Sequence, residues 1–249
     1  MLIDSHCHLH DQEENFQVSD VVAHAHENQV DEMITIGTTI ADSLNAQKVA
    51  NEFPEIFWSF GYHPQEFDGD IARFEQELAA SKYVFEDDKK LRAIGEIGLD
   101  YHYEPYNKEH QIALLERMLQ LAQDQKLPVS FHVRDAFEDF WPIFDNFHLV
   151  TSVMHSFSDS EENLKEAMRR DLFVGVNGLA TFAKLNLPEI DRIVFETDTP
   201  YLTPKPFRGT INKPGYVYHI AKWASEHYGL SFGEVAEITT KNAKKIFKI

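Results

Sequence analysis

Near its start the chain reads DSHCHLH, a stretch with three histidines, one aspartate and the only cysteine of the sequence. If this stretch lies on a strand, His6 and His8 project from one face while Cys7 points away, because successive side chains alternate. Two imidazoles in a His-x-His pair are suited to hold one divalent ion such as Zn²⁺ or Mn²⁺. We interpret Cys7 as a small buried apolar residue. On a strand, Asp4 and His10 would project from the same face as His6 and His8. Asp4 has either a supporting role beside the ligands or a purely structural role.

Further candidate ligands stand at the ends of short apolar runs elsewhere in the chain. They are His63 in GYHPQ, Glu96 in AIGEIGLDY, His132 in PVSFHVRDA, His155 in VMHSFSDS and Asp198 in IVFETDTPYL. Each has an ordinary alternative when taken alone, since a histidine is often a hydrogen-bonded or surface group and an aspartate before proline often forms a turn. Their joint placement at separate strand ends favours a metal site, because a barrel brings such ends together.

The pattern of apolar runs predicts the elements that position these residues. Eight runs, which we interpret as strands, occupy Met1–Ser5, Met33–Gly37, Ile56–Phe60, Ala93–Ile97, Val129–Phe131, Ser152–Met154, Phe173–Val176 and Ile193–Phe195. Most are separated by helical patterns such as Asn107–Gln125. This alternation favours a (β/α)8 TIM barrel, and we expect residues 1–249 to form one such domain. The main rival is a doubly wound sheet, but no G-x-G-x-x-G follows the first run. Ser158 and Ser231 each precede a glutamate by three residues, which predicts helix starts.

Composition and charge limit the class of protein. Of 249 residues, 43% are hydrophobic, which is enough for a sizeable core. No apolar run reaches the length of about 18 residues that indicates a transmembrane helix. The formal net charge of −18 excludes a general nucleic-acid coating protein, which would need a basic surface. Divalent cations bound in a local site would be able to attract phosphates instead. The single cysteine and the lack of a signal-peptide pattern lead us to expect a cytoplasmic location.

Eight stretches of the sequence together resemble the TatD-type metal-dependent hydrolases, a branch of the amidohydrolase-like barrels. In the family's order they are IDSHCHL, GYHPQ, AIGEIGLDY, LPVSFHVRDA, HSFS, ETDTPYLTP, RGTINKP and ITTKNAKKIF. The resemblance implies a barrel with two divalent metal ions (Zn²⁺, Mg²⁺ or Mn²⁺) and DNA-hydrolysing activity that is commonly exonucleolytic. The substrate it implies is DNA, and we expect single strands or strand ends to be bound, with no membrane partner.

The resemblance also implies a role for each candidate ligand. The ligands of the two metal ions would be His6, His8, Glu96, His132, His155 and Asp198. In this scheme His6 and His8 hold the first ion, Glu96 bridges to the second, and the other two histidines complete the second. Asp198 binds the first ion and also accepts a proton from the attacking water. A carboxylate suits the bridging role because it offers two oxygens.

Other residues are candidates for contacts to the substrate. His63, from the G-x-H-P element, resembles a substrate-facing residue of the family. The guanidinium groups of Arg134 and Arg208 are well shaped for phosphate oxygens, although surface solvation is the alternative for both. Aromatic rings near the ligands would be able to stack on bases, but we favour a packing role for at least half of them: Tyr62, Tyr101, Tyr103, Phe157 and Tyr201.

The sequence departs from the family pattern in two places. Asp159 stands where the family usually has glycine after H-x-F-S, which adds a negative charge near the expected mouth of the site. Only Ala183–Ile190 separates Phe182 from Asp191, and these eight residues reach at most about 12 Å as a helix. We therefore expect the helix after the seventh strand to be missing. Its flank would be covered by a partner subunit, as in a homodimer, or left open as a wider substrate entrance.

Two other functions fit the same barrel. One is a metal-dependent hydrolase of a small amide, lactone or phosphoester, since a fold does not fix its substrate. The other is a non-enzymatic binding barrel, which the complete set of candidate ligands disfavours. The stretches RGTINKP and ETDTPYL favour the nuclease by resemblance only. The acidic segment 70–90 is interpreted as a solvated helical face.

Overall fold

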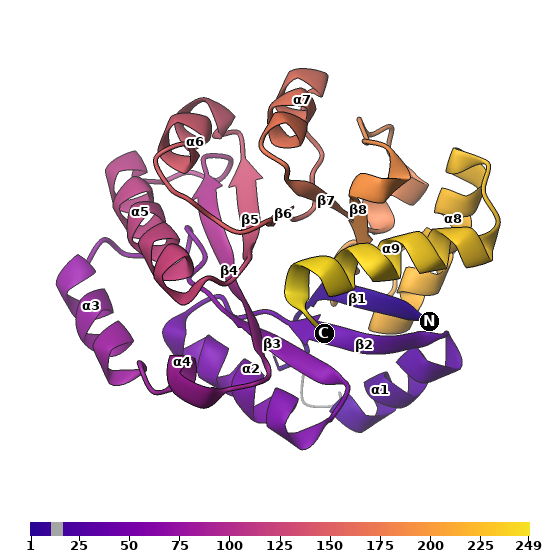
Figure 1. Ribbon diagram of the computed structural model, residues 1–249, viewed down its shortest axis with the longest axis horizontal. Coiled ribbons are helices and arrows are strands. Elements are labelled where there is room, and N and C mark those ends of the chain that lie inside the picture. The colour runs from indigo at the N-terminus through magenta and orange to yellow at the C-terminus, as the bar shows by residue number, and fades with distance from the viewer. Residues whose placement is uncertain (11–16) are drawn as a thin grey trace.

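In a computed structural model that describes residues 1–10 and 17–249, eight parallel strands form a nearly closed barrel (Figure 1). Their order in the sheet follows the chain: β1 (Leu2–Cys7), β2 (Val30–Thr35), β3 (Ile56–Phe60), β4 (Leu91–Asp100), β5 (Val129–Arg134), β6 (Val153–Met154), β7 (Phe173–Val176) and β8 (Ile193–Phe195). Each strand lies at or overlaps a predicted apolar run, so the predicted barrel is confirmed. Because all strands are parallel, their carboxyl ends meet at one end of the barrel.

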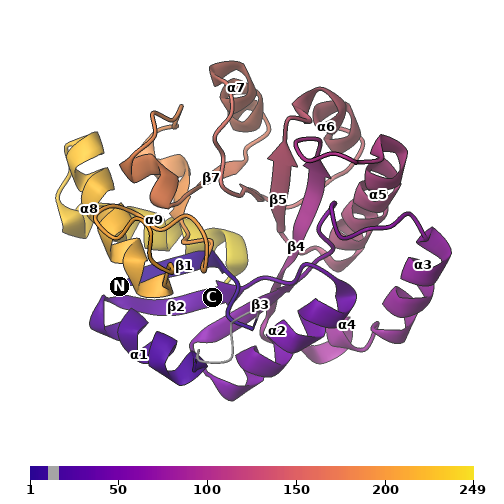
Figure 2. The ribbon, with the colours of Figure 1, turned by 180° about the vertical axis from the view of Figure 1, so that it is seen from behind.

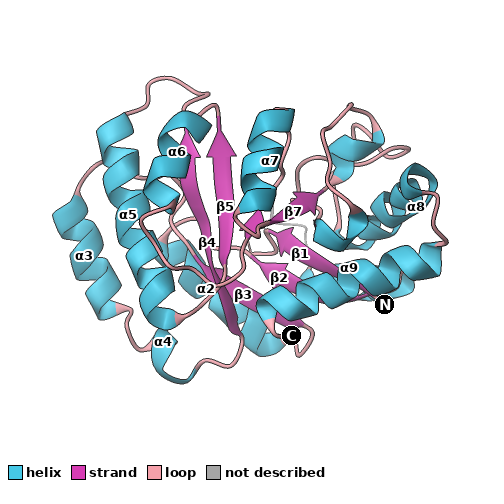
Figure 3. Ribbon diagram, turned by 45° about the horizontal axis from the view of Figure 1, so that its top comes forward, coloured by secondary structure: helices cyan, strands magenta, loops and turns pink. Residues whose placement is uncertain are grey.

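Helices form the outer layer of the barrel, as Figures 2 and 3 show from two further directions. The α-helices are α1 (Val18–Glu27), α2 (Ile40–Glu52), α3 (Ile71–Ala80), α4 (Val84–Asp87), α5 (Lys108–Gln125), α6 (Phe137–Phe144), α7 (Glu161–Arg169), α8 (Val217–Tyr228) and α9 (Phe232–Phe247). Three 3-10 turns accompany them: η1 (Gly178–Thr181), η2 (Ile190–Arg192) and η3 (Pro214–Tyr216). None of the helices in the described part of the chain is long and apolar enough to cross a membrane.

Side-chain caps start several of these helices. The predicted capping box at the start of α9 is confirmed, because Ser231 accepts from the backbone N–H of Glu234 and the Glu234 carboxylate accepts in return. The prediction for Ser158 is wrong. The cap of α7 is Ser160, whose hydroxyl accepts from the backbone N–H of Asn163 at 3.2 Å. A capping hydroxyl must stand directly before the helix, and Ser158 lies too early in the chain to reach that N–H.

The connection from β7 to β8 contains η1 and η2 but no α-helix, as the short segment Ala183–Ile190 predicts. The flank left without a helix is covered by the chain itself. Leu185 and Leu187 pack against the main hydrophobic core. The hydroxyl of Tyr228, at the end of α8, donates to the carbonyl oxygen of Pro188 at 2.9 Å. The short segment suggested that a partner subunit covers this flank or that the flank stays open as a wider entrance. These contacts show that the chain covers the flank by itself, and a homodimer stays a prediction.

The barrel closes through contacts between β1 and the chain at and beyond β8. The Ser5 hydroxyl donates to the carbonyl oxygen of Phe195 at 2.9 Å. The buried Asp4 carboxyl accepts from the Thr197 backbone N–H at 2.9 Å and from its hydroxyl at 2.5 Å. Asp4 also accepts from the backbone N–H of His6 at 3.3 Å. Asp4 thus joins the first strand to the last, which gives it the structural role that the sequence left open.

Two clusters of buried apolar side chains fill the molecule. The larger one lies mainly between the strands and the outer helices and includes Trp58, Phe131 and Phe140. The smaller one combines side chains of β1, β2, β4, β6, β7 and β8 with Ala243, Ile246 and Phe247 of α9. Figure 1 shows α9 lying across β1, near both marked chain ends. The last helix therefore completes a core that six strands share.

Candidate metal centre

His6 and His8 lie at the carboxyl end of β1, and both imidazoles point toward the segment after β8. Nε2 of His6 and Nε2 of His8 lie 3.7 and 3.5 Å from Oδ1 of Asp198. Cys7, between them, is fully buried and its thiol faces the carbonyl oxygen of Ile34 at 3.4 Å. The alternation of a strand therefore places the two histidines together and the cysteine on the other side, as predicted.

Glu96, in the middle of β4, is the centre of the cluster. Its Oε2 lies 3.4 Å from Nε2 of His6. Its Oε1 lies 2.7 Å from Nδ1 of His132, 3.7 Å from Nε2 of His155 and 3.9 Å from Nε2 of His63. The two oxygens of one buried carboxylate thus face different histidines, which come from β1, β5 and the segments after β3 and β6.

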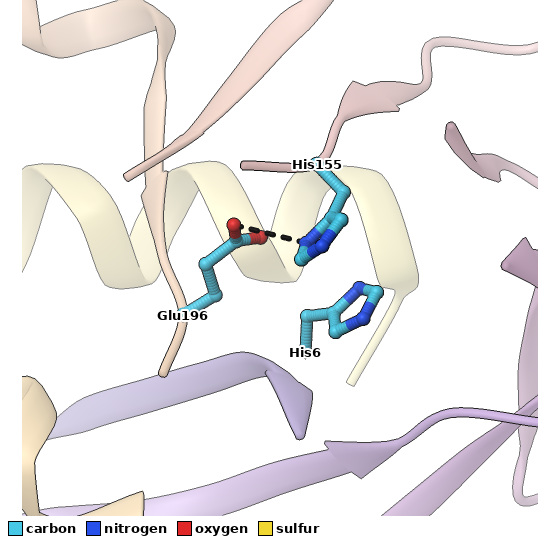
Figure 4. A group of neighbouring side chains, drawn as sticks. All are labelled: His6, His155 and Glu196. Carbon is cyan, nitrogen blue, oxygen red and sulfur yellow. Dashed lines mark ion pairs between the residues drawn. The ribbon is translucent and has the colours of Figure 1, made fainter. Parts of the chain in front are cut away.

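Two further carboxylates, which are not among the predicted ligands, hold the histidines in place. Oε1 of Glu196 lies 3.0 Å from Nδ1 of His155, and Figure 4 shows this pair beside His6. The rings of His6 and His155 stack with centroids 3.5 Å apart. In the same way, Oδ2 of Asp100 lies 2.9 Å from Nε2 of His132. A carboxylate on the second ring nitrogen fixes the orientation and tautomer of a metal-binding histidine.

A signal for both missed residues was present in the sequence. Asp100 lies four residues after Glu96 on the same strand, and Glu196 lies two residues before Asp198. Even spacing on an extended chain places side chains on one face, which is the rule that selected His6 and His8. The same rule, applied to GEIGLD and ETD, selects these two carboxylates.

Neighbouring carboxylates raise the pKa of three histidines in the metal-free site, and for His8 the hydrogen bond to Asp198 does so against the effect of burial. Burial alone would lower the pKa of His155, but the negative charges around it, that of Glu196 foremost, raise it to about 10. Burial also opposes a positive charge on His132, whose pKa is nevertheless raised to about 9, first by the hydrogen bond to Asp100. The imidazoles of His132 and His155 therefore carry a proton at neutral pH when no cation is bound.

Two carboxylates and His63 have lowered pKa values instead. Burial would raise the pKa of Asp198, but the surrounding imidazoles, His155 foremost, lower it to about 2. They also hold the pKa of Glu96 well below its ordinary value, against the effect of burial. Burial and the nearby His132 lower the pKa of His63 to about 4. At neutral pH the two carboxylates are thus ionised and His63 is neutral.

The donor set fits divalent cations. Nε2 of His6 is buried and makes no hydrogen bond to any described residue, and a buried polar atom without a partner is costly unless a ligand completes it. The ligand atoms of His6, His8 and Glu96 lie within 4.8 Å of one another, and so do those of Glu96, His132 and His155. Glu96 belongs to both groups. Imidazole nitrogen with carboxylate oxygen is a donor set suited to Zn²⁺ or Mn²⁺.

A cavity of about 740 Å³ lies over this cluster. His63 and Arg134, for which substrate contacts stay a prediction, line it. Arg208 is not among the described residues that line it. Its guanidinium group lies over the ring of Phe182 at 3.9 Å, and Nη1 donates to the carbonyl oxygen of Thr203 at 3.3 Å. The structure therefore gives Arg208 a place in the loop after β8 and not in the cavity.

The predicted aromatic residues divide into two groups. Tyr62, Tyr101 and Phe157 are buried among the residues of the main core, which is the packing role that we favoured for at least half of the set. Tyr103 and Tyr201 are exposed and line the cavity.

Asp159, the expected extra charge at the mouth of the site, is not among the described residues that line the cavity. It lies at the start of α7, where its Oδ1 accepts from the side-chain amide of Asn163 at 2.6 Å. The structure therefore uses Asp159 to fix the beginning of a helix.

A parallel eight-stranded barrel with histidines and carboxylates gathered at the carboxyl ends of its strands defines the class of barrel-shaped metal-dependent hydrolases. The chain belongs to the TatD family within this class, because it matches the family model described as TatD related DNase over residues 3–248. The resemblance drawn from the motifs is thereby confirmed.

Known relatives match most or all of the chain. YabD of Bacillus subtilis (strain 168), named only as a metal-dependent hydrolase, is 34% identical over 258 residues, which cover 100% of both chains. A protein of Citrobacter rodentium (strain ICC168), named 3′-5′ ssDNA/RNA exonuclease TatD, is 30% identical over 92% of this chain and 91% of its own. The crystal structure of YjjV, a TatD homologue from Escherichia coli K12, has the same fold, with a TM-score of 0.86, 23% identity and coverage of 100% and 98%. The protein is a metal-dependent hydrolase.

Proposed function

We propose that the protein is a divalent-metal-dependent deoxyribonuclease, which removes nucleotides from single-stranded DNA or from strand ends. The observation that carries the proposal is the position of Glu96, whose two oxygens face different histidines at 2.7 to 3.9 Å. A carboxylate so placed suits a bridge between two cations, and paired cations serve displacement at phosphodiesters. The name of the C. rodentium relative, an exonuclease of ssDNA and RNA, supports a nucleic-acid substrate.

In this proposal His6, His8 and Asp198 hold one divalent ion, which is Zn²⁺, Mg²⁺ or Mn²⁺. His132 and His155 would hold the second ion, and Glu96 would be available to either ion. When bound, the cations supply Lewis acidity to the phosphate oxygens and to the attacking water.

The chain's own residues orient the ligands and move the proton. Glu196 and Asp100 each hold a second ring nitrogen of a histidine at 3.0 and 2.9 Å, which keeps the imidazoles aimed at the centre. Asp198 accepts the proton of the attacking water, since its carboxylate lies 3.7 and 3.5 Å from the proposed ligands His6 and His8 and is ionised at neutral pH. His63, held neutral by its lowered pKa, offers a hydrogen bond to the substrate without adding charge.

Charge limits how the substrate binds. Arg134 is the arginine among the described residues that line the cavity, and no lysine is among them. The rest of the chain is acidic, with a net charge of −18. Phosphates are therefore attracted only at the metal centre and at Arg134, which favours contact with one or two nucleotides over wrapping of a long duplex.

A cleavage assay tests the proposal. Single-stranded and duplex DNA labelled at the 5′ end are incubated with the purified protein and Mg²⁺, Mn²⁺ or Zn²⁺, with EDTA in a parallel arm. The variant His155→Ala removes a proposed ligand, whereas His148→Ala removes an exposed histidine outside the cavity and serves as the matched control. We expect a metal-dependent ladder of products with the wild type and the control.

The expected loss in His155→Ala is at least about a hundredfold, since a ligand of the centre is gone. A ladder that shortens from the 3′ end would also give the direction of attack. If the folded, metal-loaded protein cleaves no DNA with any of the three metals, the proposal is wrong, and small amides, lactones and phosphoesters are the next substrates to assay.

A further inference from the structure

A second cavity lies beside the one over the metal centre. It has a volume of about 530 Å³ and lies between the segment after β3 and the segment that leads from β4 into α5. Gln65 and Tyr103 line both cavities, so the two share a wall. The helices that follow these segments, α3 and α5, lie side by side in Figures 1 and 2. An ion pair between Glu75 and Arg117 joins them. The proposed hydrolysis alone makes no use of this second space.

The wall of the second cavity is rich in rings and poor in positive charge. Its rings come from Phe67, Tyr103, Tyr106 and His110. Among the described residues that line it, the carboxylates are Asp68 and Glu104, and there is neither a lysine nor an arginine. Asp68 is already paired with Arg73 at 2.9 Å, and none of the described residues that line the cavity offers a cation to a phosphate. The wall suits a neutral planar group with two aromatic faces and amino or amide donors, which is the chemistry of a nucleobase.

Tyr103 is held in place at the boundary between the cavities. The guanidinium carbon of Arg134 lies 4.9 Å from the centroid of its ring. The ring of His102 meets it edge-on at 4.7 Å, and Nδ1 of His102 lies 2.7 Å from Oδ2 of Asp135. Even so, 57% of Tyr103 is exposed. A ring that is fixed by its neighbours and still open to solvent loses little conformational entropy when another ring stacks on it.

We propose that the second cavity binds the base of a nucleotide next to the scissile phosphate, and that Tyr103 is the surface on which this base stacks. The inference rests on the proposed function, because it takes the substrate to be a nucleic acid. Arg134 touches the Tyr103 ring and lines the metal cavity, so its charge is available to the phosphate while the ring is available to the base. Stacking accepts every base, so the site selects unpaired strands and not a sequence.

The test removes the ring from the protein and the base from the substrate, one at a time and together. The substrate is a ten-residue thymidylate chain labelled at the 5′ end. In companion chains, an abasic tetrahydrofuran residue replaces one of the four nucleosides nearest the attacked end. Cleavage at each position is measured as kcat/KM for the wild type, Tyr103→Ala and Tyr103→Phe. Tyr83→Ala is the matched control, because Tyr83 is 59% exposed and lies outside both cavities.

We expect removal of the base at one position to lower the wild-type kcat/KM by about tenfold, as the loss of one stacked base does. On the complete chain, the kcat/KM of Tyr103→Ala is expected to lie about tenfold below that of the wild type, mostly through KM. On the abasic chain, it is expected to lie less than about twofold below that of the wild type, since the stacked pair is already broken. Tyr103→Phe keeps an aromatic ring at this position, and Tyr83→Ala leaves the Tyr103 ring intact. Both variants are therefore expected to prefer the complete chain over the abasic chain as the wild type does.

The outcomes separate the inference from the proposed function. If DNA is cleaved and Tyr103→Ala responds to base removal as the wild type does, the base site is wrong while the nuclease stands. In that case Tyr103→Ala falls by the same factor on complete and abasic chains, and any such fall reports a structural role of the ring. If the metal-loaded wild type cleaves none of these chains, the proposed function is wrong and the inference falls with it.

Discussion

Asp4 joins the two edges of the sheet, and its removal is expected to loosen the closure of the barrel. The change Asp4→Ala takes away the acceptor of the Thr197 N–H and the partner of the Thr197 hydroxyl, at 2.9 and 2.5 Å. The hydroxyl keeps a second partner in Thr199 at 2.7 Å, but among the described residues Asp4 is the acceptor of the buried N–H. A buried polar group left unpaired costs about 1–3 kcal/mol, and a lost hydrogen bond costs about 1 kcal/mol more. The sum is about 3 kcal/mol.

For a domain of this length, 1 kcal/mol corresponds to about 2–4 °C in Tm, so Asp4→Ala is expected to melt about 6–12 °C below the wild type. Thermal unfolding followed by circular dichroism measures this shift at a fixed scan rate. The reasoning is refuted if Asp4→Ala melts within about 2 °C of the wild type, because that is less than the cost of a single orphaned group.

Asp4→Asn is the matched control. Burial raises the pKa of Asp4 to about 8, so the native carboxyl is largely neutral at neutral pH and an amide resembles it in charge. The asparagine oxygen accepts from the Thr197 N–H, and its NH₂ donates to the Thr197 hydroxyl, which turns to donate to Thr199. We expect a loss of less than about 1 kcal/mol. If Asp4→Asn is as unstable as Asp4→Ala, the hydrogen-bond pattern is not the reason for the effect.

Four further predictions follow from the site and the caps. Asp198→Asn should lower kcat for DNA cleavage by about 10²–10⁴-fold in a single-turnover assay, because a positioned proton acceptor is lost. Glu196→Gln should weaken metal binding by about 10–100-fold in a competition with a chelating dye, since it alters the partner of a proposed ligand. Metal binding at pH 7 should release protons, because His132 and His155, with pKa values of about 9 and about 10, must become neutral to coordinate. Affinity should therefore rise with pH up to about 10, and calorimetry in buffers of different ionisation enthalpy counts the released protons. Ser231→Ala should cost about 1 kcal/mol, or about 2–4 °C in Tm, through the lost capping box.

Each of these has a result that contradicts it. Unchanged kcat in Asp198→Asn would remove this carboxylate from the proton transfer, and unchanged metal affinity in Glu196→Gln would make its contact to the ligand histidine irrelevant to binding. Heats of metal binding that do not depend on the buffer would mean that no proton leaves. A Ser231→Ala variant as stable as the wild type would show that the start of α9 is held by packing alone.

Local spacing was sufficient to predict much of the barrel and of the site. Apolar runs locate strands because their interior must be buried, and parity on a strand places His6 with His8. The same reasoning applies to Asp100 and Glu196, which were overlooked because a carboxylate that supports a ligand looks in sequence like any other acid. Their role depends on which histidine lies opposite, and in the structure that histidine comes from another strand.

The remaining differences depend on geometry that one sequence does not contain. Ser158 and Ser160 both precede acidic residues, and only the actual first residue of α7 decides which hydroxyl caps it. Arg208 lies in a loop whose direction is set by stacking on Phe182, not by a periodic pattern. The flank after β7 was predicted to lack its helix, but the way in which the chain covers it depends on α8, which follows much later in the sequence.

The smaller apolar cluster has a consequence for how the protein is made. Six strands spread over the chain from β1 to β8 share it with Ala243, Ile246 and Phe247 of α9. During synthesis, the strands leave the ribosome long before this helix does. A nascent chain that stops before α9 would therefore expose part of the barrel interior to water, and the closing contact between Asp4 and Thr197 spans 193 positions of sequence. Contacts this distant form slowly, so the growing chain depends on protection from aggregation until its last helix emerges.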